Sequence, residues 1–97
     1  MCRATVRIKK ELYESYQKYL VKNNLTMKDD LTKHIKSQVD NYSIPSNYFK
    51  DYSNMEYSKL NFEIEKNLYE SYKNILTKNN TIPTADIIRY IMKIVEK

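Results

Sequence analysis

Hydrophobic and polar residues alternate in two short stretches of the chain, one near its start and one in its second half. The hydrophobic members are, in chain order, Ala4, Val6, Ile8, Leu60, Phe62 and Ile64. A period of two residues is typical of a strand that buries one face. The pattern therefore predicts two half-buried strands. Their polar faces carry Arg3, Thr5, Arg7, Lys59, Asn61 and Glu63.

Directly after each alternating stretch, the spacing of the hydrophobic residues becomes that of a helix. The two stripes consist of Leu12, Tyr16, Tyr19 and Leu20, and of Leu68, Tyr72, Ile75 and Leu76. Each stripe ends at a pair of asparagines, Asn23 and Asn24 or Asn79 and Asn80. The chain contains no glycine, and asparagine is the usual substitute in the left-handed conformation that ends many helices. We therefore expect one residue of each pair to cap its helix.

A second helix is expected after each asparagine pair. In the first half Thr26 is a suitable N-cap, with Asp29 three residues on, which approximates a capping box. In the second half Pro83 suits the first helical position, where its missing N–H costs no hydrogen bond. These helices are expected to bury Leu31, Ile35, Val39, Ile87, Ile88, Ile91 and Val95.

The two halves are copies of one unit. Leu12-Tyr13-Glu14-Ser15-Tyr16 returns as Leu68-Tyr69-Glu70-Ser71-Tyr72, at an offset of 56 residues that also aligns the flanking segments. A unit of about 36 residues is too small to bury its own core, and a single strand leaves an unpaired edge. We therefore predict a mainly α-helical protein with one two-stranded antiparallel ribbon, an intramolecular pseudo-dimer in the order β-α-α, linker, β-α-α.

The pseudo-dimer is expected to form one domain over residues 1–97, with repeats at 3–40 and 59–97 and a linker at 41–58. The linker is rich in Tyr, Ser and Asn, and the helical spacing of Tyr48, Tyr52 and Met55 predicts a short helix against the bundle. Stacking of its rings on single-stranded bases is a second interpretation. The simpler explanation for ten tyrosines is a composition biased toward residues with A/T-rich codons.

Composition and charge narrow the classes of protein. A hydrophobic content of 41% suits a compact core, and no run of apolar residues approaches transmembrane length. The start of the chain has no apolar signal core, and Cys2 has no second cysteine with which to pair, so we expect a cytoplasmic protein without membrane contact. The net charge of +5 fits either a polyanionic partner or a basic protein that is merely soluble.

No residue pattern favours an enzyme. His34 is the only histidine, and the repeat aligns it with Tyr90, where an aromatic ring on a helix is sufficient. A glycine-rich phosphate loop is impossible in a chain without glycine. Carboxylates such as Glu11, Glu14 and Glu70 lie on polar helix faces beside lysines, where solvation or ion pairing explains them. We therefore expect neither catalysis, nor a cofactor, nor a metal.

Each copy resembles a ribbon-helix-helix unit, the fold of the Arc and MetJ repressors, whose strands enter the DNA major groove. The segment Val6-Arg7-Ile8-Lys9-Lys10-Glu11-Leu12 resembles the junction between strand and first helix in that family. The resemblance implies base contacts from Arg3, Thr5, Arg7, Lys59, Asn61 and Glu63. It also implies phosphate contacts at the start of each second helix, from Thr26, Met27, Lys28, Ile82, Pro83 and Thr84.

The second copy departs from the family pattern at two positions. Glu63 occupies a place where basic or amide residues are more usual, and Pro83 removes one N–H donor from the expected phosphate site. Both changes predict that the halves contact DNA unequally, so the preferred site is expected to be asymmetric. Alternatively, the second copy is a structural half that adds little specificity.

The resemblance thus implies a sequence-specific protein that binds double-stranded DNA with its ribbon in the major groove. Single-chain tandem versions resemble TraY-like accessory proteins, which bind a plasmid transfer origin and help to load a relaxase. We favour this use, with repression of a local promoter as a second activity and further copies side by side on the DNA. A transcriptional repressor at an operator is the first alternative. A protein interaction module with an acidic partner is an alternative of another class.

Overall fold

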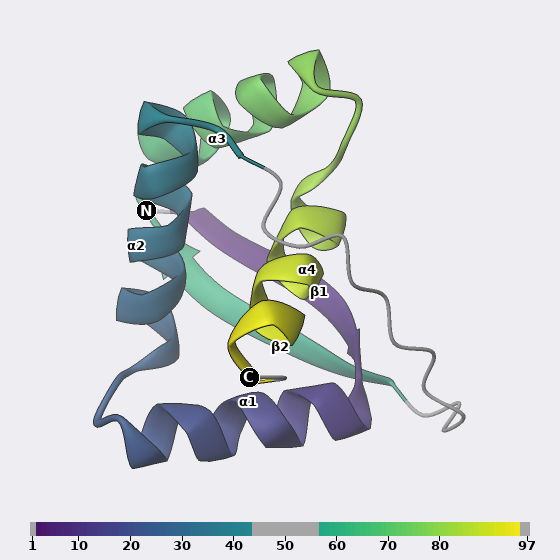
Figure 1. Cartoon of the computed structure of the whole chain (residues 1–97). Coiled ribbons are helices and arrows are strands. Elements are labelled where there is room, and N and C mark those ends of the chain that lie inside the picture. The colour runs from purple at the N-terminus through teal and green to yellow at the C-terminus, as the bar shows by residue number, and fades with distance from the viewer. Residues whose placement is uncertain (1, 44–56, 96–97) are drawn as a thin grey trace.

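The computed structural model describes residues 2–43 and 57–95, which form four helices and one two-stranded antiparallel sheet (Figure 1). In chain order the elements are β1 (Cys2–Lys9), α1 (Lys10–Lys22), α2 (Met27–Asp40), β2 (Tyr57–Ile64), α3 (Lys66–Lys78) and α4 (Pro83–Val95). The mainly helical class, the antiparallel ribbon and the order β-α-α-β-α-α are therefore as predicted. The helix expected around Tyr48 to Met55 lies outside the described residues.

The two strands pair along their whole length. Thr5 lies opposite Asn61, and the register runs from Cys2 opposite Ile64 to Lys9 opposite Tyr57. β2 thus begins before residue 59, where the second repeat was expected to start. The side chains alternate between buried and exposed on both strands, as a period of two residues requires.

The buried face of the ribbon forms the floor of the core. Ala4, Val6 and Ile8 of β1 are at most 2% exposed, and the apolar residues of β2 lie beside them. All four helices add to this single cluster, with Tyr16 of α1 and Tyr72 of α3 fully buried. In Figure 1, α1 lies along the bottom of the molecule and α3 along the top, with α2 and α4 between them.

The helices of the two halves pack across each other. α2 contacts α3, and α1 contacts α4, so the second helix of each half lies against the first helix of the other. The ribbon also joins one strand from each half. The apolar surfaces of each half are therefore covered largely by the other half, as expected for units too small to bury a core alone.

Both asparagine pairs end their helices as the sequence predicts. Asn24 and Asn80 have φ angles of 53° and 58°, in the left-handed region. After α1 the amide of Leu25 donates to the carbonyl of Leu20 at 2.9 Å, and after α3 the amide of Thr81 makes the equivalent bond to Leu76. A hydrogen bond from the amide of residue i+5 to the carbonyl of residue i is typical of a Schellman motif. This motif satisfies carbonyl groups that have no partner at a helix end.

The starts of the second helices also follow the prediction. The hydroxyl of Thr26 accepts a hydrogen bond of 3.1 Å from the amide of Asp29, so Thr26 caps α2. Pro83 is the first residue of α4. The two halves therefore begin their second helix in different ways, one with a side-chain N-cap and the other with a proline. The two helix starts consequently differ in the number of backbone N–H groups that they leave open.

Candidate nucleic-acid interface

The exposed face of the ribbon carries six polar side chains in three cross-strand pairs. Side chains that alternate with the core residues must project to the opposite face of a strand. The register places Arg3 opposite Glu63, Thr5 opposite Asn61, and Arg7 opposite Lys59, and all six residues are exposed. The structure thus brings together on one face every residue for which the resemblance implied a base contact.

The three pairs differ in what holds them. At the centre, Thr5 Oγ1 donates a hydrogen bond of 2.7 Å to Asn61 Oδ1. At one end, Arg3 and Glu63 form an ion pair of 3.9 Å, with side chains that are 68% and 56% exposed. So long and exposed a pair contributes little to stability. At the other end Arg7 and Lys59 place like charges side by side, which favours an anionic partner there.

An aromatic ring lies beside the basic end of the face. The Arg7 guanidinium carbon is 4.4 Å from the centre of the Tyr57 ring, and the Lys9 ammonium nitrogen is 4.3 Å from it. The Tyr57 residue remains 45% exposed. It was not predicted to belong to the interface, because it was assigned to the linker. The alternation of Tyr57, Lys59 and Asn61 was the signal that places it on the strand.

The predicted phosphate contacts lie at two separate helix starts. In α2, Thr26 and Lys28 are exposed and Met27 is half-buried, while the Thr26 hydroxyl already holds one backbone amide of the first turn. In α4, Ile82 is 60% exposed and Pro83 and Thr84 are half-buried. The two starts lie on opposite sides of the molecule in Figure 1. The structure therefore does not gather these six residues into one site.

Two aspartates of the second helices are buried, although aspartate side chains are rarely buried in proteins. Asp30 of α2 and Asp86 of α4 occupy equivalent positions in the repeat, and they are 7% and 1% exposed. Tyr16 donates its hydroxyl to Asp30 at 2.6 Å, and Tyr72 donates its hydroxyl to Asp86 in the same way. Each carboxylate thus accepts a hydrogen bond from the first helix of its own half.

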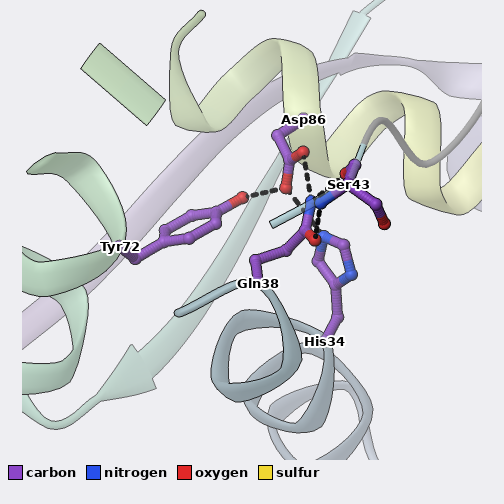
Figure 2. Close-up of polar contacts among 5 residues, drawn as sticks. All are labelled: His34, Gln38, Ser43, Tyr72 and Asp86. Carbon is purple, nitrogen blue, oxygen red and sulfur yellow. Dashed lines mark hydrogen bonds and ion pairs between the residues drawn. The ribbon is translucent and has the colours of Figure 1, made fainter. Parts of the chain in front are cut away.

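The other half of the chain supplies a second donor to each carboxylate. Tyr90 of α4 donates to Asp30 at 2.9 Å. His34 of α2 lies with its Nε2 atom 2.7 Å from Asp86, and Gln38 donates to Asp86 at 2.8 Å (Figure 2). Every buried side-chain nitrogen and oxygen atom of the described residues has a partner. The two networks therefore join α2 to α4 through polar contacts that are fully satisfied.

The environment of these groups fixes their charge. Burial and the hydrogen bond to Asp30 raise the pKa of Tyr16, and burial and the bond to Asp86 raise that of Tyr72, so both hydroxyls stay neutral. Burial alone would raise the pKa of Asp86, but the hydrogen bonds and charge that face it, first those of His34, outweigh burial and lower the pKa below its usual range. Because an ionised carboxylate only accepts, Nε2 of His34 carries the hydrogen.

His34 also lies flat against Tyr90. The two ring centres are 4.1 Å apart and the ring planes differ by 15°. The sequence aligned these residues as equivalent aromatic positions, and the structure stacks them on each other across the contact between α2 and α4. His34 therefore has the aromatic role on a helix that was expected, and it is packed rather than solvent-touching. The repeat did not indicate its bond to the buried Asp86.

Metal-binding clusters and membrane-spanning helices are both absent from the described residues. Within residues 2–43 and 57–95, no group of three or more His, Cys, Asp or Glu side chains could hold a metal ion. The helices in the same part of the chain are too short or too polar to cross a membrane.

Comparison with protein-family models, with curated proteins and with solved structures found no match for this chain. Its own residues therefore have to carry any assignment of function. Three side chains at the centre and basic end of the ribbon face, those of Thr5, Arg7 and Asn61, are exposed and carry donors and acceptors of the kinds that can contact base edges.

Proposed function

We propose that the chain is a ribbon-helix-helix pseudo-dimer that binds double-stranded DNA in a sequence-specific manner. The observation that carries this proposal is the exposed face of β1 and β2, where six polar side chains alternate along the strands with the buried apolar residues of the core. A surface ribbon without a further role would be free to carry any polar residue. Here the face combines cations, an amide and a hydroxyl within a width that a DNA groove accepts.

The interpretation as a pseudo-dimer is supported by the polar core as well as by the ribbon. The partners of Asp30 are Tyr16 from the first half and Tyr90 from the second. Those of Asp86 include Tyr72 from the second half and His34 from the first. Separation of the halves would leave both buried carboxylates with only part of their donors. The two repeats therefore act as one folding unit, in the way that two chains do in a symmetric dimer.

Recognition is proposed to occur in the major groove. An arginine or lysine can donate to O6 and N7 of guanine, and an asparagine can pair with N6 and N7 of adenine. Arg7 and Lys59 supply the first kind of contact and Asn61 the second. Glu63 engages Arg3 in an ion pair, so that end of the face offers less positive charge to DNA. An asymmetric target site follows from this difference.

The use that we propose is that of an accessory protein at a plasmid transfer origin, where it would act beside a relaxase and other copies of itself, in the cytoplasm. An asymmetric reading face suits a non-palindromic origin. It equally suits a non-palindromic operator, so repression of a promoter is the second candidate. In either role the chain is a binding protein rather than an enzyme.

Methylation interference tests the proposed groove directly. Guanine N7 projects into the major groove, so methylation at the contacted guanines is expected to block binding to a duplex that the protein prefers. The blocked guanines should fall within one short segment for each chain bound, because a single ribbon spans only a few base pairs. Binding that is indifferent to N7 methylation, and that is lost only on methylation of adenine N3 in the minor groove, would overturn the proposal.

Lys28 is expected to contact phosphate and not bases. Its replacement by alanine should weaken binding to all duplexes alike and lower the slope of log K against log salt by about one. Lys36→Ala is the matched control, because Lys36 is exposed on the same helix but far from its start. Equal slopes for the two variants would mean that total charge, and not the helix start, determines the effect.

A further inference from the structure

The exposed face of the ribbon continues beyond the three pairs already described. Lys9 and Tyr57 lie opposite each other in the register and on the same face as Arg7 and Lys59. Tyr57 is 45% exposed, so its ring covers little of the core. A large aromatic residue held at the surface of a strand needs another reason, and its neighbours supply one.

Tyr57 holds two cations against its ring. The Arg7 guanidinium carbon is 4.4 Å from the ring centre and the Lys9 nitrogen is 4.3 Å from it. A cation near an aromatic face is attracted by the ring electrons. A guanidinium that stacks face-on against a ring keeps its N–H edges open to a base. Tyr57 can therefore restrict the side chain of Arg7 without blocking the edge that would pair with guanine.

The opposite end of the face has no such arrangement. There Arg3 is paired with Glu63 at 3.9 Å, and Glu65, exposed at the start of α3, stands where the first repeat has Lys9. The repeat also aligns Arg7 with Glu63. One end of the face thus combines three cations with a ring, and the other pairs one cation with a carboxylate. The positive charge of the exposed face is therefore concentrated at one end of the ribbon. In a DNA groove that holds the ribbon, this charge difference would run along the groove.

We propose that Tyr57 is a positioning residue for Arg7, and that it makes the end with Arg7, Lys9 and Lys59 the dominant half of the DNA contact. This inference rests on the proposed function, because it assigns the source of specificity within the same face. A restricted arginine loses less conformational freedom when it binds a base than a mobile one does. The chain therefore lies on its site in one direction, set by the base that Arg7 reads.

The test compares Tyr57→Ala, Tyr57→Phe, Arg7→Ala and the double variant Tyr57→Ala/Arg7→Ala on the duplex preferred by the native protein and on all its single base-pair changes. Tyr57→Ala should lower the preference at one base pair by about two- to fivefold, and this base pair should be the one that Arg7→Ala relaxes. Tyr57→Phe retains the ring and should retain the preference. The double variant should discriminate no worse at that base pair than Arg7→Ala alone.

A loss in Tyr57→Ala that adds fully to the loss in Arg7→Ala would overturn the positioning role, as would an unchanged preference in Tyr57→Ala. Thermal unfolding of each variant shows that the fold is retained, which is expected because both side chains are exposed. Failure of the proposed function itself would look different, because the native protein would then show no preferred duplex at all.

Discussion

Replacement of Asp86 by alanine is expected to lower the free energy of unfolding by about 3–5 kcal/mol. Asp86 is 1% exposed and accepts hydrogen bonds from Tyr72 and Gln38, with His34 2.7 Å away. Its removal leaves the hydroxyl of Tyr72, Nε2 of His34 and one N–H of the Gln38 amide without an acceptor, while Gln38 keeps its bond to the carbonyl of Ser43. Each buried donor that loses its partner costs free energy when it is kept from water. Urea denaturation followed by circular dichroism measures the change.

Asp40→Ala provides the matched control for this variant. Asp40 is exposed at the end of α2, so the same change of charge should alter stability by less than about 0.5 kcal/mol. Asp86→Asn keeps the shape of the side chain but replaces one acceptor with a donor, and it should fall between the two. A loss in Asp86→Ala no larger than that in Asp40→Ala would show that the buried network does not hold α2 to α4.

The effect of Asp86 is also expected to depend on pH. The pKa of Asp86 is lower in the folded chain than in the unfolded chain, where a carboxyl titrates near about 3.9. Its contribution is therefore complete above that pH and is lost as the pH falls through the folded value. The part of the stability difference between the native protein and Asp86→Ala that comes from the Asp86 charge should be complete above that pH and shrink in acid. A difference that grows in acid would contradict the lowered pKa.

Joint replacement of Arg3, Arg7 and Asn61 by alanine is expected to abolish preference for the cognate duplex. Arg7 alone should account for about 1–3 kcal/mol at one base pair, the usual range for a paired contact to a base edge. Binding to unrelated DNA should persist in weakened form, because phosphate contacts are left in place. Competition between cognate and scrambled duplexes measures the ratio of specific to non-specific affinity. This ratio is needed because the affinity for one duplex includes both base contacts and phosphate contacts.

The control for the ribbon variant changes the same kinds of residue elsewhere. Lys18, Lys22 and Gln17 are exposed on α1, so their joint replacement by alanine removes two positive charges and one amide away from the ribbon. Cognate preference should survive in that variant, although total affinity falls with charge. If the two triple variants lose preference equally, or if the ribbon variant keeps it, the bases are not read by this face.

Much of the fold was accessible from local patterns. The period of two in residues 4–8 and 60–64 predicted the strands, because a strand with one buried face must alternate. The caps at Asn24 and Asn80 followed from the absence of glycine, which leaves asparagine as the residue best able to adopt a positive φ. Such features depend on a few neighbouring residues, so they can be predicted without knowledge of packing.

The burial of the two aspartate carboxylates could not be predicted from local sequence patterns. An aspartate in the first turn of a helix is usually exposed there, where it favours the positive end of the helix. The partners of Asp30 and Asp86 come from helices of both halves, and only the tertiary packing brings them together. The repeat did contain a trace of the network, because Asp30 and Asp86 align at the same offset as their tyrosine partners.

Tyr57 was missed for a different reason. Tyr57 lies in a tyrosine-rich segment that was assigned to the linker on its composition. The alternation of exposed and buried residues from Tyr57 through Glu63 shows that the strand begins earlier than was predicted. The exposure of the six residues expected to contact bases was predicted correctly, because that alternation is unambiguous within the strand itself. Which of them bear most of the specificity depends on side-chain contacts such as that of Arg7 with Tyr57, which no local pattern determines.

Selection of bound duplexes from a random library at about 0.15 M salt tests whether the ribbon recognises a DNA sequence, because non-specific binding through charge is weak at that salt concentration. We expect the native protein to enrich a short, non-palindromic motif, and the variant that lacks Arg3, Arg7 and Asn61 to enrich no such motif. Recovery of unrelated sequences by the native protein, with an affinity that depends only on salt, would show that the ribbon does not recognise sequence and would favour a protein interaction module.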